Sequence, residues 1–129
     1  HKRTYPWGDS LPDENGTWLA NYNEEPHYGR NRGQKSTSRV GSFSKGASPY
    51  GCLDMAGNVW EWTAEPFRLR SMKKEIKARQ AEIKGYKLLK GGSFLCHKSY
   101  CYRYRIAARS GNLPDSTTTH QGFRVVWDL

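Results

Sequence analysis

Two cysteines are the residues of this chain whose type and spacing most directly suggest chemistry. Cys96 and Cys101 lie five residues apart, in a segment that begins with Gly91-Gly92-Ser93 and ends in alternating aromatic and basic residues. On a strand this odd separation puts the two side chains on opposite faces, and on a helix it leaves them poorly aligned. The two sulfur atoms therefore meet only if the backbone between them is irregular, and the paired glycines permit unusual backbone angles at its start.

Three chemistries are open to such a pair. A disulfide is one, although so short a loop gives little entropic stabilisation. Zinc prefers four ligands, and the neighbourhood offers only His97 as a third. Two thiolates suit Cu(I), which is soft and accepts few ligands, and the nearby cations Lys98, Arg103 and Arg105 would favour the deprotonated thiols. The plain structural alternative is that both cysteines are small buried hydrophobic residues, and spacing alone does not separate these interpretations.

The basic charge of the chain is concentrated in one segment. The length of 129 residues suits a single domain, and the net charge is +9. Residues 68–90 hold nine Lys or Arg against Glu75 and Glu82, which is +7 of that total. A solvated basic insertion explains this distribution better than a nucleic-acid footprint does, so no specific nucleic-acid partner is expected.

Hydropathy and the cysteine count indicate whether the protein meets a membrane and which redox compartment suits it. The sequence has no run of about 18 apolar residues, so no membrane partner is expected. Three cysteines cannot all pair within one chain, and this number fits a reducing compartment or cysteines that do chemistry. The thiol of Cys52 is expected to be buried beside Tyr50 and Leu53.

The elements that must position these residues are short. Thirteen glycines and six prolines indicate turns and irregular backbone, and five tryptophans and eight tyrosines can supply a core. Period-2 patterns predict strands, and one apolar stripe at helical spacing predicts a surface helix that Gly85 ends. The pattern favours an α+β domain dominated by irregular structure. The strands are expected at residues 40–43, 59–63, 86–90, 102–108 and 122–127, and the helix at residues 68–84.

Several motifs resemble those of formylglycine-generating enzymes, in the sulfatase-modifying-factor family. The resemblance runs through nearly the whole chain apart from a basic helical insertion at about residues 67–86. It implies a C-type-lectin-like α+β fold with little regular secondary structure. It also implies that residues 1–129 are the C-terminal catalytic portion of the family domain, whose N-terminal half is expected to be absent. The motifs are Tyr5-Pro6-Trp7-Gly8-Asp9, residues 54–62 (DMAGNVWEW), residues 96–105 (CHKSYCYRYR), residues 107–110 (AARS), Pro114-Asp115-Ser116 and Gly122-Phe123-Arg124.

The resemblance implies a copper-dependent oxidase. Such an enzyme binds an unfolded sulfatase polypeptide at a Cys-x-Pro-x-Arg segment and uses O2 to convert the cysteine to Cα-formylglycine. Cys96 and Cys101 would hold Cu(I), and the substrate thiolate would be the third ligand. Ser93 and Trp60 would line the pocket for oxygen and substrate, although a turn cap and a core side chain are their plainer roles. The residues expected to bind substrate are His97, Tyr100, Arg105 and His120.

The same resemblance implies calcium. Asp54 and Glu61, with the carbonyl groups of Gly57 and Val59, match one site, and carboxylates with carbonyl oxygens are suitable ligands for a hard cation. A salt bridge or solvated acids are the alternative. A second calcium site would use Asn21 and the carbonyl group of Tyr22, but residues 30–34 supply no carboxylate where the family has an acid.

Departures from the family pattern bear on location and on the competing function. Ile106 and Val125 stand where secretory-pathway relatives have disulfide cysteines, which favours a cytoplasmic, bacterial-type protein without structural disulfides. His120 replaces a common Asn near the substrate groove. The competing function is a non-catalytic, lectin-like ligand- or protein-binding module on the same fold. Such a module would need variable residues at about 112–120, where this chain has the defined turn Pro114-Asp115-Ser116.

Overall fold

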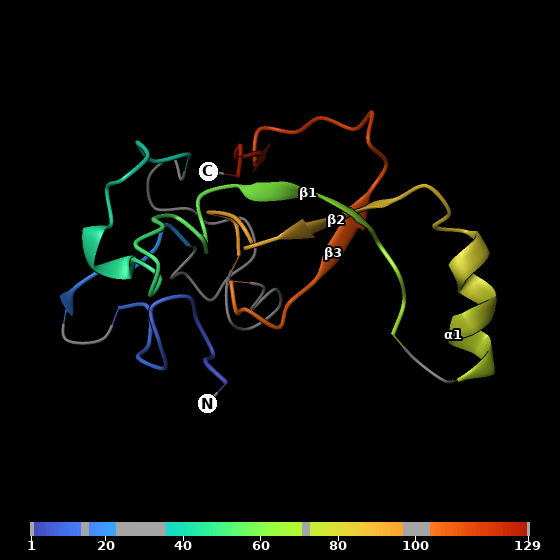
Figure 1. Cartoon of the computed structure of the whole chain (residues 1–129), viewed down its shortest axis with the longest axis horizontal. Coiled ribbons are helices and arrows are strands. Elements are labelled where there is room, and N and C mark those ends of the chain that lie inside the picture. Colours follow the sequence, from blue (N-terminus) through green and yellow to red (C-terminus); the bar gives the residue numbers. More distant parts are fainter. Residues whose placement is uncertain (1, 14–15, 23–35, 71–72, 97–103, 129) are drawn as a thin grey trace.

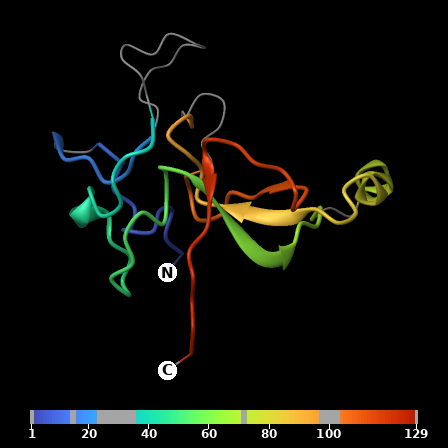
Figure 2. The same ribbon diagram turned by 90° about the horizontal axis from the view of Figure 1, so that it is seen from above.

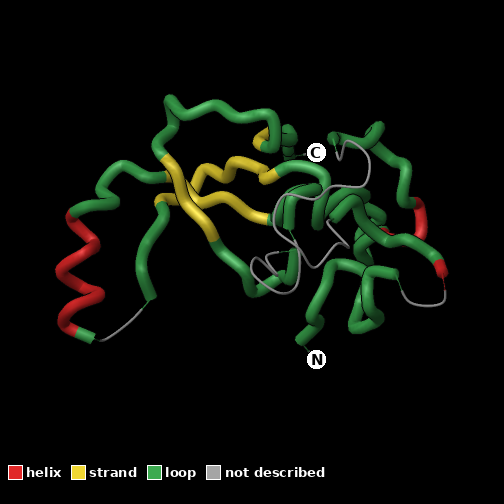
Figure 3. Tube along the Cα trace, turned by 180° about the vertical axis from the view of Figure 1, so that it is seen from behind, coloured by secondary structure: helices red, strands yellow, loops and turns green. Residues whose placement is uncertain are grey.

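A computed structural model describes residues 2–13, 16–22, 36–70, 73–96 and 104–128. A small sheet lies in the middle, a loop-rich region lies on one side of it, and the α-helix lies at the opposite end (Figure 1 and Figure 3). This mixture confirms the expected α+β class. The elements are η2 (Ser44–Gly46), β1 (Trp60–Pro66), α1 (Lys74–Ala78), η3 (Arg79–Ala81), β2 (Lys87–Lys90), β3 (Ser110–Asn112) and β4 (Gln121–Gly122).

The sheet is mixed, with the strand order β3-β2-β1-β4. β1 and β2 are antiparallel and pair Glu61 with Lys90, while β1 and β4 are parallel. Because of this antiparallel register, the start of β1 lies beside the end of β2. The segment after Lys90, which leads to Cys96, therefore leaves the sheet next to Trp60.

Aromatic side chains build the core in the loop-rich region. Tyr5 stacks on Tyr104 with ring centroids 5.9 Å apart, and Tyr22 packs against Tyr104 at 5.1 Å. Large rings bury enough area to join loops that have few aliphatic residues. The buried cluster consists of Tyr5, Ala20, Tyr22, Ala56, Trp60, Leu89, Cys96 and Tyr104.

Two of the strand predictions are confirmed. The strand expected at residues 59–63 is β1, which continues to Pro66, and the strand expected at residues 86–90 is β2. β3 was not predicted, because Ser110-Gly111-Asn112 has no strand-like composition. A glycine is required at position 111 for steric reasons, because a Cβ atom there would lie 2.3 Å from the ring of Phe67.

The other strand predictions are wrong over the described residues. Residues 40–41 form a turn, with a positive φ of 80° at Gly41. Residues 104–107 form turns and a bend instead of a strand, because Tyr104 points into the ring cluster and the amide of Ala108 bonds to the carbonyl oxygen of Arg105. β4 ends at Gly122, and the exposed residues 123–128 continue as an extended segment away from the body (Figure 2).

The predicted helix is much shorter than expected. Within residues 68–84, α1 has five residues and continues into the single 3-10 turn η3, and neither contains a buried residue. A charged segment without a core to pack on gains little from helix formation beyond its propensity. In the described part of the chain, no helix has the length and apolar character needed to cross a membrane. Cys52 is exposed, as is Tyr50, so the predicted burial of this thiol is wrong.

Candidate functional site

The loop that carries Cys96 is docked on the turn before β1. Gly91 and Gly92 have positive φ angles of 95° and 70°. The amide of Gly57 donates to the carbonyl oxygen of Gly91 at 2.7 Å, and the amide of Phe94 donates to that of Asn58 at 2.9 Å. A Cβ atom at Gly91 would lie 3.0 Å from the carbonyl oxygen of Met55. The paired glycines are therefore required by backbone angle and by this close approach.

The sulfur of Cys96 is buried, and its residue is 2% exposed. The amide of Ser93 donates to this sulfur at 3.4 Å, and the amide of Cys96 donates to the carbonyl oxygen of Ser93 at 3.0 Å. Cys96 is disulfide-bonded in this structure. Cys101 lies outside the described residues, as do His97 and Tyr100.

The structure brings Trp60 and Ser93 to the neighbourhood of Cys96. Trp60 belongs to the same buried cluster as Cys96, and Ser93 is 1% exposed. The hydroxyl group of Ser93 accepts a hydrogen bond from the amide of Leu95 at 3.2 Å, so it also caps the local turn. These three residues form the described part of the candidate oxidation site.

The residues expected to bind substrate are only partly described. The carbonyl oxygen of His120 accepts a hydrogen bond from the amide of Trp60 at 2.7 Å, which places His120 beside the start of β1. Arg105 is half-buried and follows Tyr104 directly. Their roles in substrate binding stay predictions.

The turn before β1 has the geometry of a strained, oxygen-rich loop. Asp54, Gly57 and Asn58 have positive φ angles of 56°, 74° and 65°. The Oδ2 atom of Asp54 accepts a hydrogen bond from the amide of Gly41 at 2.7 Å. Its Oδ1 atom is buried and has no hydrogen-bond partner among the described residues. An orphaned buried carboxylate oxygen fits a cation ligand, since an unpaired buried charge is costly.

Glu61 is held by a cation of the chain itself. The Nε atom of Arg124 lies 2.7 Å from Oε1 of Glu61, and Nη2 of Arg124 donates to the carbonyl oxygen of Asp54 at 3.1 Å. The salt bridge expected as the alternative for these acids is therefore present at Glu61. Arg124 was not expected at this site, although its position in the motif Gly122-Phe123-Arg124 was a signal.

The proposed second calcium site is described only at its first two residues. The side-chain amide of Asn21 donates to the carbonyl oxygen of Ser36 at 3.0 Å and to Oδ1 of Asn58 at 3.3 Å. The backbone carbonyl oxygen of Asn21 accepts from the amide of Asn58 at 2.7 Å. Tyr22 packs in the aromatic core, and residues 30–34 lie outside the described part. These contacts connect Asn21 to the turn before β1.

Side chains of the usual metal-binding types do not gather elsewhere. Within the described ranges there is no group of three or more His, Cys, Asp or Glu residues that could hold a metal ion. A site made of two thiolates needs no such group, whereas a structural zinc site does.

The whole chain, residues 1–129, matches the sulfatase-modifying factor enzyme 1-like domain, and it therefore belongs to this family. It is 42% identical over 137 residues to the formylglycine-generating enzyme of Mycobacterium tuberculosis, which covers 97% of this chain and 45% of that protein. It is 30% identical over 125 residues to the inactive C-alpha-formylglycine-generating enzyme 2 of Bos taurus, covering 95% of this chain and 36% of the relative. The chain thus spans 34% to 45% of the length of the formylglycine-generating enzymes that it matches.

Among solved structures, Treponema denticola variable protein 1 is similar in fold. The match has a TM-score of 0.55 and 23% identity, and it covers 81% of this chain and 34% of that protein. This likeness supports the family's fold and carries no information on activity.

Proposed function

We propose that this chain contributes the cysteine site of an oxidase that converts a sulfatase cysteine to Cα-formylglycine. The observation that carries the proposal is the buried sulfur of Cys96, which lies with Ser93 and Trp60 at the junction of β1 and β2. The similarity to formylglycine-generating enzymes over nearly the whole chain supports the same assignment. The proposed substrate is an unfolded sulfatase segment of the form Cys-x-Pro-x-Arg.

The proposed site requires Cys96 and Cys101 in the reduced form. A soft sulfur donor at a buried position suits Cu(I), which would supply electron transfer between the substrate thiolate and O2. The need for reduced thiols agrees with the proposed cytoplasmic location, where disulfides are kept reduced.

The electron balance of the reaction requires an external reductant. Conversion of a CH2–SH group to an aldehyde and hydrogen sulfide removes two electrons, whereas reduction of O2 to water takes four. Peptidyl cysteine, O2 and two molecules of an external thiol therefore give peptidyl formylglycine, hydrogen sulfide, water and one disulfide.

The described residues of the chain would contribute position and exclusion of water. The amide of Ser93 donates a hydrogen bond to the sulfur of Cys96 and would hold this sulfur in position. The ring of Trp60, 7% exposed, would close the buried side of the pocket. Arg105 and His120, with His97 and Tyr100, are proposed to bind the substrate segment.

We also propose that the turn before β1 binds calcium through Asp54 and Glu61 and the carbonyl groups of Gly57 and Val59. The orphaned Oδ1 atom of Asp54 supports this assignment. The contact of Arg124 with Glu61 opposes it, because a guanidinium group and a cation compete for the same carboxylate. The second site, at Asn21 and Tyr22, is proposed with no such orphaned oxygen in its support.

The function is tested by exposing the reduced, copper-loaded protein to a Cys-x-Pro-x-Arg peptide and an external thiol in air. Mass spectrometry and an aldehyde-reactive probe should detect formylglycine, and the same peptide with serine in place of cysteine should stay unmodified. Copper binding without any aldehyde would instead favour the non-catalytic binding module. One relative of this chain is named as an inactive enzyme, so this outcome is a real alternative.

A further inference from the structure

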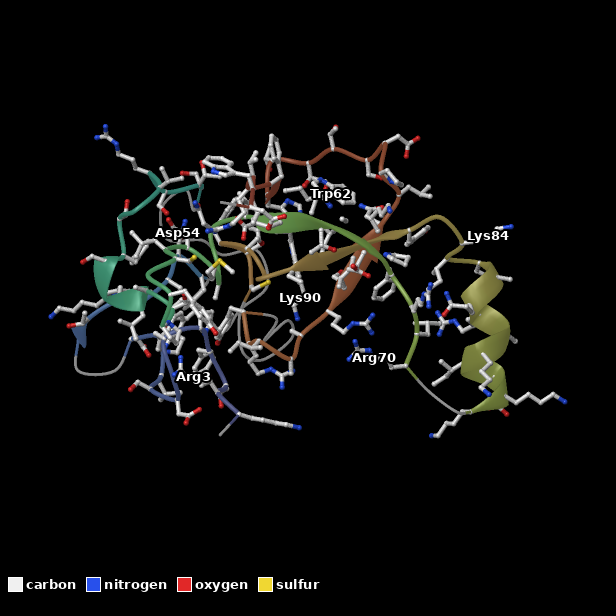
Figure 4. The ribbon with its side chains drawn as sticks, in the orientation of Figure 1. Arg3, Asp54, Trp62, Arg70, Lys84 and Lys90 are labelled. Atoms are coloured by element: carbon white, nitrogen blue, oxygen red, sulfur yellow. The ribbon has the colours of Figure 1, made fainter. Side chains whose placement is uncertain are left out.

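Lys90, the last residue of β2, reaches across to the segment that follows Tyr104. Its Nζ atom donates to the carbonyl oxygen of Ile106 at 2.5 Å and to that of Ala108 at 2.6 Å. Figure 4 shows this side chain leaving β2 below the sheet, on the same side as Arg70. One ammonium group therefore bonds two carbonyl groups that lie 16 and 18 residues further along the chain.

These bonds join the two flanks of the cysteine segment. Lys90 directly precedes Gly91-Gly92-Ser93, which positions Cys96, and its two acceptors, Ile106 and Ala108, lie shortly after Tyr104. Cys96 and Tyr104 both belong to the buried cluster. Residues 104–107 are turns and a bend, and the amide of Ile106 donates to the carbonyl oxygen of Thr4 at 2.8 Å. The Lys90 contacts join Ile106 and Ala108 to the end of β2.

The surroundings of Lys90 are unfavourable for a charge. Its pKa is lowered from the usual 10.5, first by burial and then by the nearby cations Arg109 and Arg70. Arg109 itself lies over the ring of Phe67, 5.4 Å from its centroid. Hydrogen bonds from an ionised donor are stronger than neutral ones, so the two carbonyl groups offset part of this cost.

We propose that Lys90 is a positioning residue that ties the end of β2 to residues 106–108 and so fixes the sulfur of Cys96 in the core. The proposal rests on the proposed function only in assigning chemistry to Cys96. The hydrogen bonds of Lys90 to residues 106 and 108, called the Lys90 tie below, are a property of the fold. Without these contacts the end of β2 and residues 106–108 separate more readily. The backbone geometry that favours the disulfide bond of Cys96 is then less populated.

Lys87 provides a matched control on the same strand. Its Nζ atom donates to the carbonyl oxygen of Ala64 at 3.0 Å, at the other end of β2. Lys90→Met and Lys87→Met both remove an ammonium donor and keep a long apolar stem. Only the first should act on the cysteine segment.

The test is the thiol–disulfide equilibrium of Cys96 in glutathione buffers, without copper or peptide. Lys90→Met should shift it toward the thiol by about tenfold, the effect of losing about one hydrogen bond from a charged group. Amide exchange of residues 104–108 should rise by a similar factor. Lys87→Met should change neither, even if it lowers global stability equally, and Lys90→Arg should restore most of the wild-type behaviour. An equilibrium in Lys90→Met equal to that of Lys87→Met overturns the proposal.

Two further outcomes keep the test decisive. If Lys90→Met does not fold, Lys90→Gln retains one amide donor and should shift the same equilibrium by a smaller factor; no shift overturns the proposal. The function fails separately. A wild-type protein that makes no aldehyde but shows the predicted Lys90 effect defeats only the oxidase, whereas aldehyde formation without a Lys90 effect defeats only the tie.

Discussion

The amide of Ser93 donates a hydrogen bond to the sulfur of Cys96 across 3.4 Å, within a turn that the two residues close. The donor belongs to the backbone, and the turn is fixed by Gly91 and Gly92, whose positive φ angles few other residues tolerate. The backbone of the loop, more than the serine side chain, therefore positions the sulfur of Cys96.

Removal of either proposed copper ligand should abolish tight Cu(I) binding. Cys96→Ser and Cys101→Ser each replace a soft sulfur with a harder oxygen, which Cu(I) binds poorly. Competition with a chromophoric Cu(I) chelator measures the affinity of the reduced protein. Cys52→Ser is the matched control, since Cys52 is exposed and lies outside the buried cluster. Undiminished copper affinity in Cys96→Ser would exclude this residue as a ligand.

The sequence predicted the centre of the sheet and missed its edges. β1 and β2 are rich in aromatic and aliphatic residues, and each strand contains one buried residue, Trp60 in β1 and Leu89 in β2, so local composition and tertiary structure agree. The segment predicted as a strand at residues 102–108 begins with alternating aromatic and basic residues, but the packing of Tyr104 against Tyr5 and Tyr22 overrides this pattern. β3 is held by its pairing with β2 and by contact with Phe67, and neither is visible in Ser110-Gly111-Asn112.

The candidate site was predicted from a resemblance, because its residues come from distant segments. No spacing argument joins Trp60 to Cys96; the antiparallel register of β1 and β2 does. The sequence did not predict the role of Lys90, because a lysine at a strand end in a basic segment is usually a solvated charge. Its role follows only from where residues 106–108 return to the sheet.

Substitution of Gly57 should be far more damaging than substitution of Gly51. Both have nearly equal positive φ angles, 74° and 78°, so each alanine variant carries the same backbone strain of about 1–2 kcal/mol. A Cβ atom at Gly57 would also lie 2.5 Å from the carbonyl oxygen of Asn21, whereas at Gly51 nothing lies within 4 Å. Urea unfolding should show a clearly larger loss for Gly57→Ala. Equal losses would mean that the contact with Asn21 is not maintained in solution.

Lys90 should make stability rise with pH in the alkaline range. Its pKa in the folded protein lies below the 10.5 expected of the unfolded chain. Between these two values the unfolded chain binds more protons, so the contribution to stability increases with pH, and below the folded pKa it is constant. The difference in unfolding free energy between wild type and Lys90→Met, in which tyrosine titration cancels, should therefore grow in favour of wild type through this window.

A second variant identifies the cause of that pH dependence. Arg109→Met removes one of the two neighbouring cations but leaves the burial of Lys90, which is the larger cause. The pH range over which stability rises should become narrower in Arg109→Met but should not disappear. Urea unfolding midpoints at successive pH values measure this range. A difference that is flat or decreasing with pH in the wild-type comparison would contradict the lowered pKa.

Calcium should stabilise the protein through Asp54. The Oδ1 atom of this residue is buried without a described partner, so a bound cation would compensate its charge. At a free calcium concentration 100 times the Kd, binding adds about 2.7 kcal/mol. Asp54→Asn keeps an oxygen that can accept the bond from Gly41 but loses the charge, and it should lose most of this increment. Thermal unfolding with excess chelator and with calcium measures the effect.

Substitution of Arg124 should increase the stabilisation by calcium, whereas substitution of Asp54 should decrease it. Arg124→Met breaks the contacts with Glu61 and with the carbonyl oxygen of Asp54, so it should lower stability without calcium. It also removes a positive charge that competes with the cation, so the increase in Tm on adding calcium should exceed that of wild type. Asp115→Asn, an exposed acid in a distant turn, is the control and should respond to calcium as wild type does. A calcium response unchanged in both Asp54→Asn and Arg124→Met would mean that the cation binds elsewhere, and that the orphaned oxygen is satisfied by water.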